Sequence, residues 1–210
     1  MDYIKRFNTI MDLTKNDTYV INRGHSNILF LGSCRTIVLS MFFEYICKTI
    51  PYFIHAQFGI QSIAVHVLSS LNKTKSSNMT SVIENADIIV CEQIRHYNIL
   101  NTSEKCVNNI FNQFNIKPNC KIIQIPNLEY FKNSDNIINI DRLANHCKKY
   151  NFICVSNMIL NNPLEELFAT CNHPKTILIL ELFTELCSIY FNQTFPIECL
   201  NHLNKIKIFT

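Results

Sequence analysis

Apolar residues along the chain fall into short runs, and these runs alternate with longer segments whose apolar positions recur at helical spacing. Short apolar runs bounded by turn residues are typical of buried strands. The predicted strands cover residues 27–31, 52–58, 86–91 and 120–125. The predicted helices cover a segment ending near residue 50 and residues 61–71, 103–114, 137–150, 163–168 and 174–191, with a surface loop at 72–79.

Strands that alternate with helices at this spacing indicate a mainly parallel sheet with helices on both faces. We therefore expect an α/β fold, a three-layer α/β/α sandwich. A chain of 210 residues is long enough for one substantial core and short for two average domains. We predict one domain over residues 1–210, with an N-terminal extension at 1–26, a core at 27–191 and a C-terminal tail at 192–210.

Composition and charge argue against nucleic-acid-binding, exported and membrane-spanning proteins. A formal net charge of +3 is far from the dense positive charge of nucleic-acid-binding proteins, so nucleic acid is not an expected partner. The N-terminal segment lacks the apolar core of a signal peptide, and no apolar run is long enough to span a bilayer. We expect a cytoplasmic protein without a membrane span.

The ten cysteines are scattered and mostly lie inside apolar runs, which favours reduced core thiols over disulfides. No Cys-x-x-Cys pair is present, and cysteine and histidine never fall at zinc-finger spacing. The sequence therefore predicts no metal site.

Only three glycines are present, so each is expected where a side chain does not fit or where φ is positive. Gly32 follows the first predicted strand and precedes Ser33 and Cys34 at the start of a helix, whereas Gly59 follows the second predicted strand. In parallel sheets, ligands bind beyond the carboxyl ends of the strands. A thiol on the first helical turn meets the helix dipole and free N–H groups, which favour the thiolate. Cys34 is therefore the candidate nucleophile.

The run from Ile28 to Arg35 resembles the first block of SGNH hydrolases, a strand followed by Gly-Asp-Ser, with Ser33 in the Asp place and Cys34 in the nucleophile place. The segment Thr170-Cys171-Asn172-His173-Pro174 resembles their fifth block, Asp-x-x-His-Pro, with His173 as the base and Thr170 where the orienting Asp stands. The resemblance implies an SGNH/flavodoxin-like fold.

A closer resemblance is to the WcbI-type polysaccharide-biosynthesis family, SGNH-like proteins linked to coenzyme A and presumed to be acetyltransferases. The matching motifs, in order, are Gly32-Ser33-Cys34, Ala86-Asp87 through Gln93, Ile125-Pro126-Asn127 and Asn172-His173-Pro174. The likeness covers residues 27–191, although that family commonly has Asn at the place of Ser33.

These resemblances imply an acyltransferase that moves an acetyl or acyl group from coenzyme A to a saccharide or other small-molecule hydroxyl. The implied catalytic group contains Cys34 and Ser33, His173 as base, and Gly59 and Gln93 as oxyanion donors. The implied cofactor-binding group contains Gly32, Arg35, Asn172 and Lys175, with Arg35 and Lys175 facing the phosphates.

Other interpretations remain open at this point. Cys34 also fits a buried structural thiol, His173 a helix-entrance residue, and Arg35 and Lys175 ordinary solvated charges. If water takes the acyl group, the protein is an esterase or thioesterase. Thr170 in place of an acidic residue favours a catalytically silent binding protein that kept this fold, unless Glu165 or Glu166 supplies the carboxylate.

Overall fold

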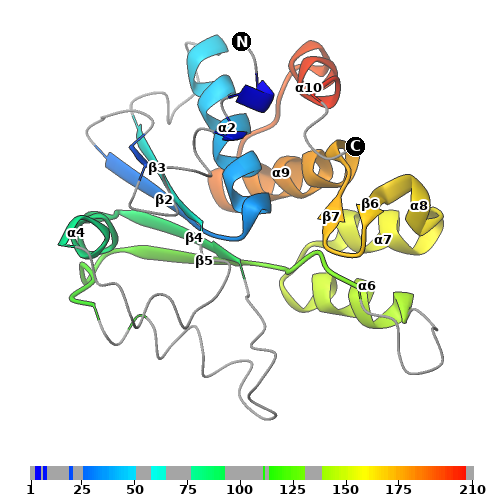
Figure 1. The fold of residues 1–210 in the computed structure, drawn as a ribbon, viewed down its shortest axis with the longest axis horizontal. Helices are drawn as coiled ribbons and strands as arrows, with labels where there is room; N and C mark the ends of the chain where they lie inside the picture. The colour runs from blue at the N-terminus through cyan, green and yellow to red at the C-terminus, as the bar shows by residue number, and fades with distance from the viewer. Residues whose placement is uncertain are drawn as a thin grey trace. The chain divides into compact units, whose positions relative to one another are not determined.

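The computed structural model describes residues 3–5, 7–8, 19–20, 26–50, 58–64, 77–92, 111, 114–130 and 139–206. The chain divides into two compact units. The first, Lys5–Gln124, contains the sheet, and the second combines Met1–Ile4 with Ile125–Thr210. Figure 1 shows the ribbon of both.

The first unit is an α/β structure built on a sheet in the order β1-β3-β2-β4-β5. Its strands are β1 (Tyr19–Val20), β2 (Ser26–Gly32), β3 (Phe58–Ala64), β4 (Ile88–Glu92) and β5 (Lys121–Ile125). β2 pairs in parallel with β3 on one side and β4 on the other, and the four strands β2 to β5 are all parallel. β1 adds a short antiparallel edge next to β3.

Helices cover both faces of this sheet. Successive side chains of a strand point to opposite faces, so the apolar residues of β2 contact a different helix on each face. Leu29 and Leu31 of β2 belong to a core cluster with Ile83 of α4 (Ser77–Asn85) and with Phe111 and Phe114. Ile28 and Phe30 point to the other face, where α2 (Cys34–Thr49) packs on β2 and β3 and the rings of Phe30 and Phe43 are 5.8 Å apart. The arrangement is consistent with a three-layer sandwich.

The order of the parallel strands places a change of winding direction beside β2. After β2 the chain forms α2 and then β3 on one side of β2, and it later returns to form β4 on the other side. The carboxyl ends of β2 and β4 therefore flank a topological switch point, the place where open α/β sheets bind ligands.

The second unit is mainly helical. Its elements are α6 (Ile140–Lys149), α7 (Ile153–Asn161), α8 (Leu164–Leu167), β6 (Phe168–Thr170), β7 (His173–Pro174), α9 (Thr176–Phe191) and α10 (Ile197–Asn204). α9 packs on α7 and α10, and β6 and β7 form a small antiparallel pair (Figure 1). Leu178, Leu182 and Leu186 recur at helical spacing and form the buried stripe of α9, whereas Ile189 is 42% exposed.

Most predicted elements are confirmed, with several corrections. The segment 61–64 is not helical, because it continues β3, and the predicted strand residues 52–57 lie outside the described residues. Residues 77–79 begin α4 instead of ending a loop. The helix predicted at 174–191 begins at Thr176, because His173 and Pro174 form β7. Of the predicted helix 103–114, only Phe111 and Phe114 are described.

Two segments assigned to the termini carry structure of their own. Tyr19 and Val20, in the predicted N-terminal extension, form the β1 edge strand, and the predicted C-terminal tail contains α10. Among the described helices, none has the length and hydropathy needed to cross a membrane.

Candidate functional site

The turn after β2 is built by Ser33, which caps α2. Its hydroxyl accepts a hydrogen bond from the Arg35 N–H at 3.3 Å, and its carbonyl accepts from the Thr36 N–H at 3.1 Å and from the Thr36 hydroxyl at 2.7 Å. A side-chain acceptor of this kind satisfies one of the backbone donors that a helix start leaves open. Ser33 therefore holds the turn that places Cys34 on the first residue of α2.

Gly32 allows the close approach of β4 to this turn. A Cβ atom at Gly32 would lie 2.6 Å from Cγ2 of Thr36 and 2.7 Å from Cβ of Glu92, well inside van der Waals contact. The backbone at Gly32 does not have positive φ, so space and not conformation requires the glycine. The predicted cofactor-binding role of Gly32 stays untested.

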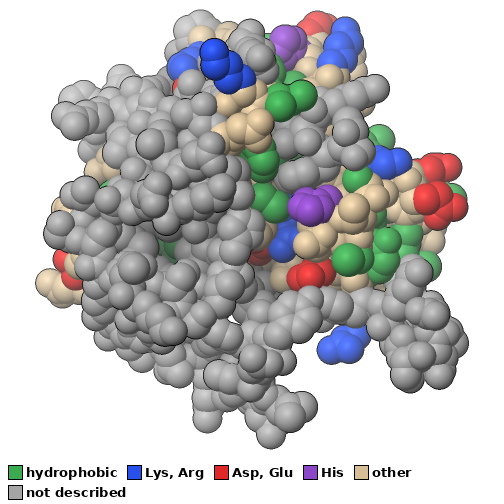
Figure 2. Space-filling model, viewed as in Figure 1, with side chains coloured by type: hydrophobic (Ala, Val, Ile, Leu, Met, Phe, Trp, Pro, Cys, Tyr) green, Lys and Arg blue, Asp and Glu red, His purple; other side chains and the backbone are tan. Residues whose placement is uncertain are grey.

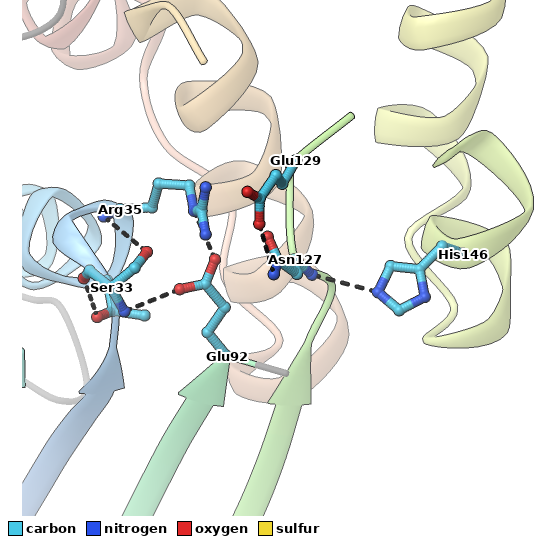
Figure 3. A network of polar contacts seen from close by, with 7 residues as sticks. Ser33, Arg35, Glu92, Asn127, Glu129 and His146 are labelled. Atoms are coloured by element: carbon cyan, nitrogen blue, oxygen red, sulfur yellow. Dashed lines mark hydrogen bonds and ion pairs between the residues drawn. The ribbon is translucent and has the colours of Figure 1, made fainter. Parts of the chain in front are cut away.

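Glu92, the last residue of β4, lies against the same turn (Figure 3). One carboxylate oxygen accepts the Ser33 N–H at 2.9 Å, and the other accepts from Nε of Arg35 at 2.5 Å. The side chains of Arg35 and Glu92 are only 7% and 1% exposed. Arg35 is therefore a buried, paired cation, and its interpretation as a solvated charge is wrong.

Cys34 is buried, with 7% of its surface exposed. Burial raises the pKa of the thiol above its ordinary value, the neighbouring Arg35 charge opposes this rise, and the Glu92 charge adds to it. Hydrogen bonds from the N–H groups of Cys34 and Arg35 also favour the thiolate. The helix start therefore favours the thiolate as expected, but desolvation is the largest of these effects and the pKa of Cys34 lies above its ordinary value.

Gly59 lies at the other end of the sheet. It is the second residue of β3 and pairs with Asn27, whereas the residue of β3 that pairs with Gly32 is Ala64. Strands rise about 3.3 Å per residue, so five residues separate Gly59 from the Gly32 end by roughly 16 Å. The prediction that Gly59 ends a strand beside Cys34 is therefore wrong. Gln93, the other predicted oxyanion donor, lies outside the described residues.

In the second unit, His173 is held by the short β6–β7 pair. Oγ1 of Thr170 lies 2.7 Å from Nδ1 of His173 and donates its proton to Oδ1 of Asn172 at 2.9 Å. A hydroxyl has one proton to donate, so Nδ1 of His173 must carry the hydrogen in this contact. The neutral imidazole then has its basic lone pair on Nε2. Thr170, Asn172 and His173 form a hydrogen-bonded chain that selects the histidine tautomer.

The remaining predicted residues of this unit lie around the same loop. Lys175 precedes α9, and its ammonium donates to the carbonyl of Glu165 at 2.5 Å. Glu165 and Glu166 are exposed, and acidic side chains gather over α8 in Figure 2. The group at Nδ1 of His173 is thus the Thr170 hydroxyl, in agreement with the spacing of the predicted motif.

A second polar cluster in this unit follows β5. Asn127 is 3% exposed, donates its N–H to Nε2 of His146 at 3.3 Å, and donates its side-chain amide to Glu129 at 3.4 Å (Figure 3). The Ile125-Pro126-Asn127 motif indicates Asn127 but not His146, because His146 lies 19 residues further along the chain, on α6.

The sequence places Glu92 with Gln93 at the end of a predicted strand, but it does not predict that the Glu92 carboxylate binds the turn after β2. One feature of the sequence could have indicated this contact. Glu92 is an acidic residue at the end of an otherwise apolar run, and the α/β pattern places the end of this strand beside Gly32. Among the described residues, no group of three or more His, Cys, Asp or Glu side chains is arranged to hold a metal ion.

No model of a known protein family matches the chain, and a search of curated proteins finds no significant match.

Proposed function

We propose that the protein is an acyltransferase with an SGNH/flavodoxin-like sheet, which moves an acyl group from coenzyme A to a saccharide hydroxyl. The observation that carries the proposal is the position of Cys34: a thiol on the first turn of α2, directly after β2, at the switch point of a parallel sheet. The strand order supports the flavodoxin-like assignment, since β3-β2-β4-β5 corresponds to the doubly wound order in which the first strand lies between the second and third.

A protonated Cys34 thiol needs a base before it can act as a nucleophile. His173 is the candidate, because its contact with Thr170 leaves the lone pair on Nε2. Thr170 orients the ring by a hydrogen bond but supplies no negative charge for the imidazolium, so the proposed pair works as a Cys34–His173 dyad. A thiol suits such a dyad, since it is more acidic and more nucleophilic than a hydroxyl.

In the proposed reaction, the proton of Cys34 Sγ passes to Nε2 of His173 as the sulfur forms a bond to the thioester carbonyl carbon. The carbonyl oxygen becomes an oxyanion, for which the N–H of Cys34 at the start of α2 and the side-chain amide of Gln93 are the proposed donors. Collapse expels the thiolate of coenzyme A, which takes the proton from His173. The acceptor hydroxyl then gives its proton to His173 as its oxygen bonds to the carbonyl carbon of the new thioester. Collapse breaks the bond to Cys34 Sγ, and the Cys34 thiolate takes the proton back from His173.

The test combines calorimetry with mass spectrometry. Coenzyme A and acetyl-CoA are titrated into wild type, Cys34→Ala and His173→Ala, and the intact protein is weighed after incubation with acetyl-CoA. We expect micromolar binding by all three and an added acetyl group on wild type but on neither of these two variants. Cys91→Ala is the matched control, because Cys91 is a buried thiol of the same unit, 3% exposed.

Each result separates the alternatives. Acetylated wild type that releases the group only with a sugar acceptor supports transfer, whereas release without an acceptor identifies a thioesterase. Failure of wild type to bind either compound argues against the coenzyme A proposal and favours an esterase or a silent binding protein. Acetylation of Cys34→Ala to the wild-type extent would remove Cys34 from the mechanism.

A further inference from the structure

The buried pair of Arg35 and Glu92 has no role in the reaction proposed above. Taking two charges out of water costs several kcal/mol, and well-packed apolar residues often stabilise a protein at least as well as a buried ion pair. The two side chains are nevertheless 7% and 1% exposed. A contribution to stability alone therefore does not explain why a charged pair occupies this buried position.

The geometry of Glu92 relates the pair to Cys34. One carboxylate oxygen holds the N–H of Ser33, the residue before Cys34, and the other holds Nε of Arg35, the residue after it. The same carboxylate lies so close to Gly32 that an added Cβ there would be 3.0 Å from Oε2. A single side chain from β4 therefore fixes the backbone on one side of the thiol and the charge on the other.

We propose that Glu92 is a positioning residue for Cys34: it fixes the turn from Gly32 to Cys34 and neutralises the Arg35 guanidinium next to the thiol. The chemical use of this arrangement rests on the acyl-transfer function proposed above. The arrangement itself has a consequence that is independent of any substrate, because it sets how readily Cys34 ionises.

Among the residues that the structure describes, the charged groups that act on the Cys34 thiol are Arg35 from α2 and Glu92 from β4. Arg35 lowers the thiol pKa and Glu92 raises it, while the N–H groups of Cys34 and Arg35 lower it. Removing the Glu92 charge removes an effect that raises the thiol pKa, while the Arg35 charge that lowers it stays. The Cys34 pKa should then fall, so the thiolate forms at lower pH.

The experiment measures the rate of Cys34 alkylation by iodoacetamide across the pH range in wild type and Glu92→Gln, with the modified peptide quantified by mass spectrometry. We expect the midpoint of the pH profile to fall by about one unit in Glu92→Gln, because a like charge next to the thiolate has been removed. The rate at neutral pH should rise by up to about tenfold.

Glu44→Gln is the matched control. Glu44 also lies on α2, its side chain is 3% exposed, and it is paired with Lys48. At about 1.5 Å per residue it lies roughly 15 Å along the helix from Cys34. Its substitution should leave the Cys34 midpoint unchanged. An equal shift in both variants would overturn the proposal, since it would show a general loosening of α2.

Unfolding is separated from repositioning by an internal probe. Cys91, next to Glu92, has a pKa raised to about 12 by burial and is 3% exposed, so it should stay unmodified while the fold is intact. If Glu92→Gln exposes Cys91, the double variant Arg35→Met with Glu92→Met decides, because it keeps buried volume without charge. Arg35 is the larger of the two charge effects on Cys34, so the double variant should raise the midpoint.

An unchanged or raised midpoint in folded Glu92→Gln would overturn the positioning role, as would a lowered midpoint in the double variant. Neither result depends on turnover. If wild type neither binds nor uses acetyl-CoA while the alkylation midpoints shift as expected, the proposed function fails and the role of Glu92 stands. If acetyl transfer is found but the midpoints do not move, the proposed function stands and the role of Glu92 fails.

Discussion

Oγ1 of Thr170 lies 2.7 Å from Nδ1 of His173, so a hydroxyl makes the contact for which SGNH-type motifs use a carboxylate. Asn172 completes the arrangement by accepting the Thr170 proton at 2.9 Å. Three neighbouring residues of one loop thereby select the histidine tautomer without adding a buried negative charge. An uncharged partner for His173 is compatible with the proposed Cys34 nucleophile, because a thiol needs less assistance from its base than a hydroxyl does.

Thr170→Val should remove this selection while nearly preserving side-chain volume. We expect the imidazole of His173 to lose its preference for hydrogen on Nδ1, which its ¹⁵N chemical shifts at neutral pH report directly. Any acyl transfer by the Cys34–His173 pair should slow by about tenfold or more, since general-base catalysis contributes at least that much. Thr184→Val is the control, because the Thr184 hydroxyl only donates to the Leu180 carbonyl at 2.9 Å within α9. Unchanged His173 shifts in Thr170→Val would contradict the tautomer assignment.

Gly32→Ala should destabilise the first unit by about 2 kcal/mol, the usual cost of forcing an extra methyl group into a packed site. The added Cβ would meet Cγ2 of Thr36 at 2.6 Å and Cβ of Glu92 at 2.7 Å. Thr36→Ser removes the first obstacle and keeps the hydroxyl that bonds to Ser33. Gly32→Ala combined with Thr36→Ser should therefore recover part of the loss relative to Thr36→Ser alone, as measured by urea denaturation. A fully tolerated Gly32→Ala would show that β4 can move away from the turn.

The central part of this fold was predictable from local pattern. The apolar run before Gly32 and the helix that follows Ser33 are both present, because a buried strand, a tight turn and a capped helix start each leave a signal in adjacent residues. Thr170 and His173 could be related from sequence for the same reason, since three positions of one loop bring them together.

The failures share a different cause. Gly59 looks like a strand end, but β3 continues through it because Ile60 and Ser62 are buried in register with β2. Arg35 looks like a surface charge until Glu92, 57 residues away in sequence, is placed beside it. In both cases the structure depends on contacts with residues distant in sequence. The hydrophobic periodicity of a segment does not show which distant residues it contacts. The elevated Cys34 pKa also depends on burial, which outweighs the local effect of the helix start.

Acid should weaken the amino-terminal end of the sheet through Asp87. Burial tends to raise the pKa of Asp87, but the hydrogen bond and charge of Lys117 and the hydrogen bond from the Asn27 N–H together lower it below its ordinary value. A carboxyl whose pKa is lower in the folded state stabilises the fold above its unfolded pKa of about 3.9 and loses that contribution as the pH falls through its folded pKa.

Asp87→Asn should therefore reduce stability at neutral pH by about 1 kcal/mol, a modest value because the Asp87 and Lys117 side chains are 36% and 41% exposed. As the pH falls below about 3.9, the difference between wild type and Asp87→Asn should shrink, because protonation makes the two side chains alike. Thermal denaturation across this range checks both statements. Glu166→Gln, at an exposed position of α8, provides the comparison. A gap between wild type and Asp87→Asn that widens in acid would contradict the assigned pKa direction.

Two glutamates on α9 should respond in opposite directions to the same change. Glu185 is 8% exposed and its two carboxylate oxygens accept the N–H groups of Cys154 and Val155 at 2.9 and 3.0 Å, at the start of α7. The N-cap residue of α7, Phe152, makes no side-chain cap hydrogen bond, so Glu185 caps this helix from a distance. Glu185→Gln should cost about 1 to 2 kcal/mol, because a charged acceptor at a helix start is replaced by a neutral one.

Glu181 lies one turn earlier on α9, where burial and then the Glu185 charge raise its pKa. A carboxyl whose pKa is higher in the folded state weakens the fold once it ionises, so the neutral Glu181→Gln should match or exceed wild type in stability at neutral pH. Urea denaturation of the two variants at neutral pH measures this contrast between neighbouring positions of one helix. Equal destabilisation by both substitutions would show that charge on α9, and not the cap of α7, determines the effect; a loss confined to Glu185→Gln supports the cap.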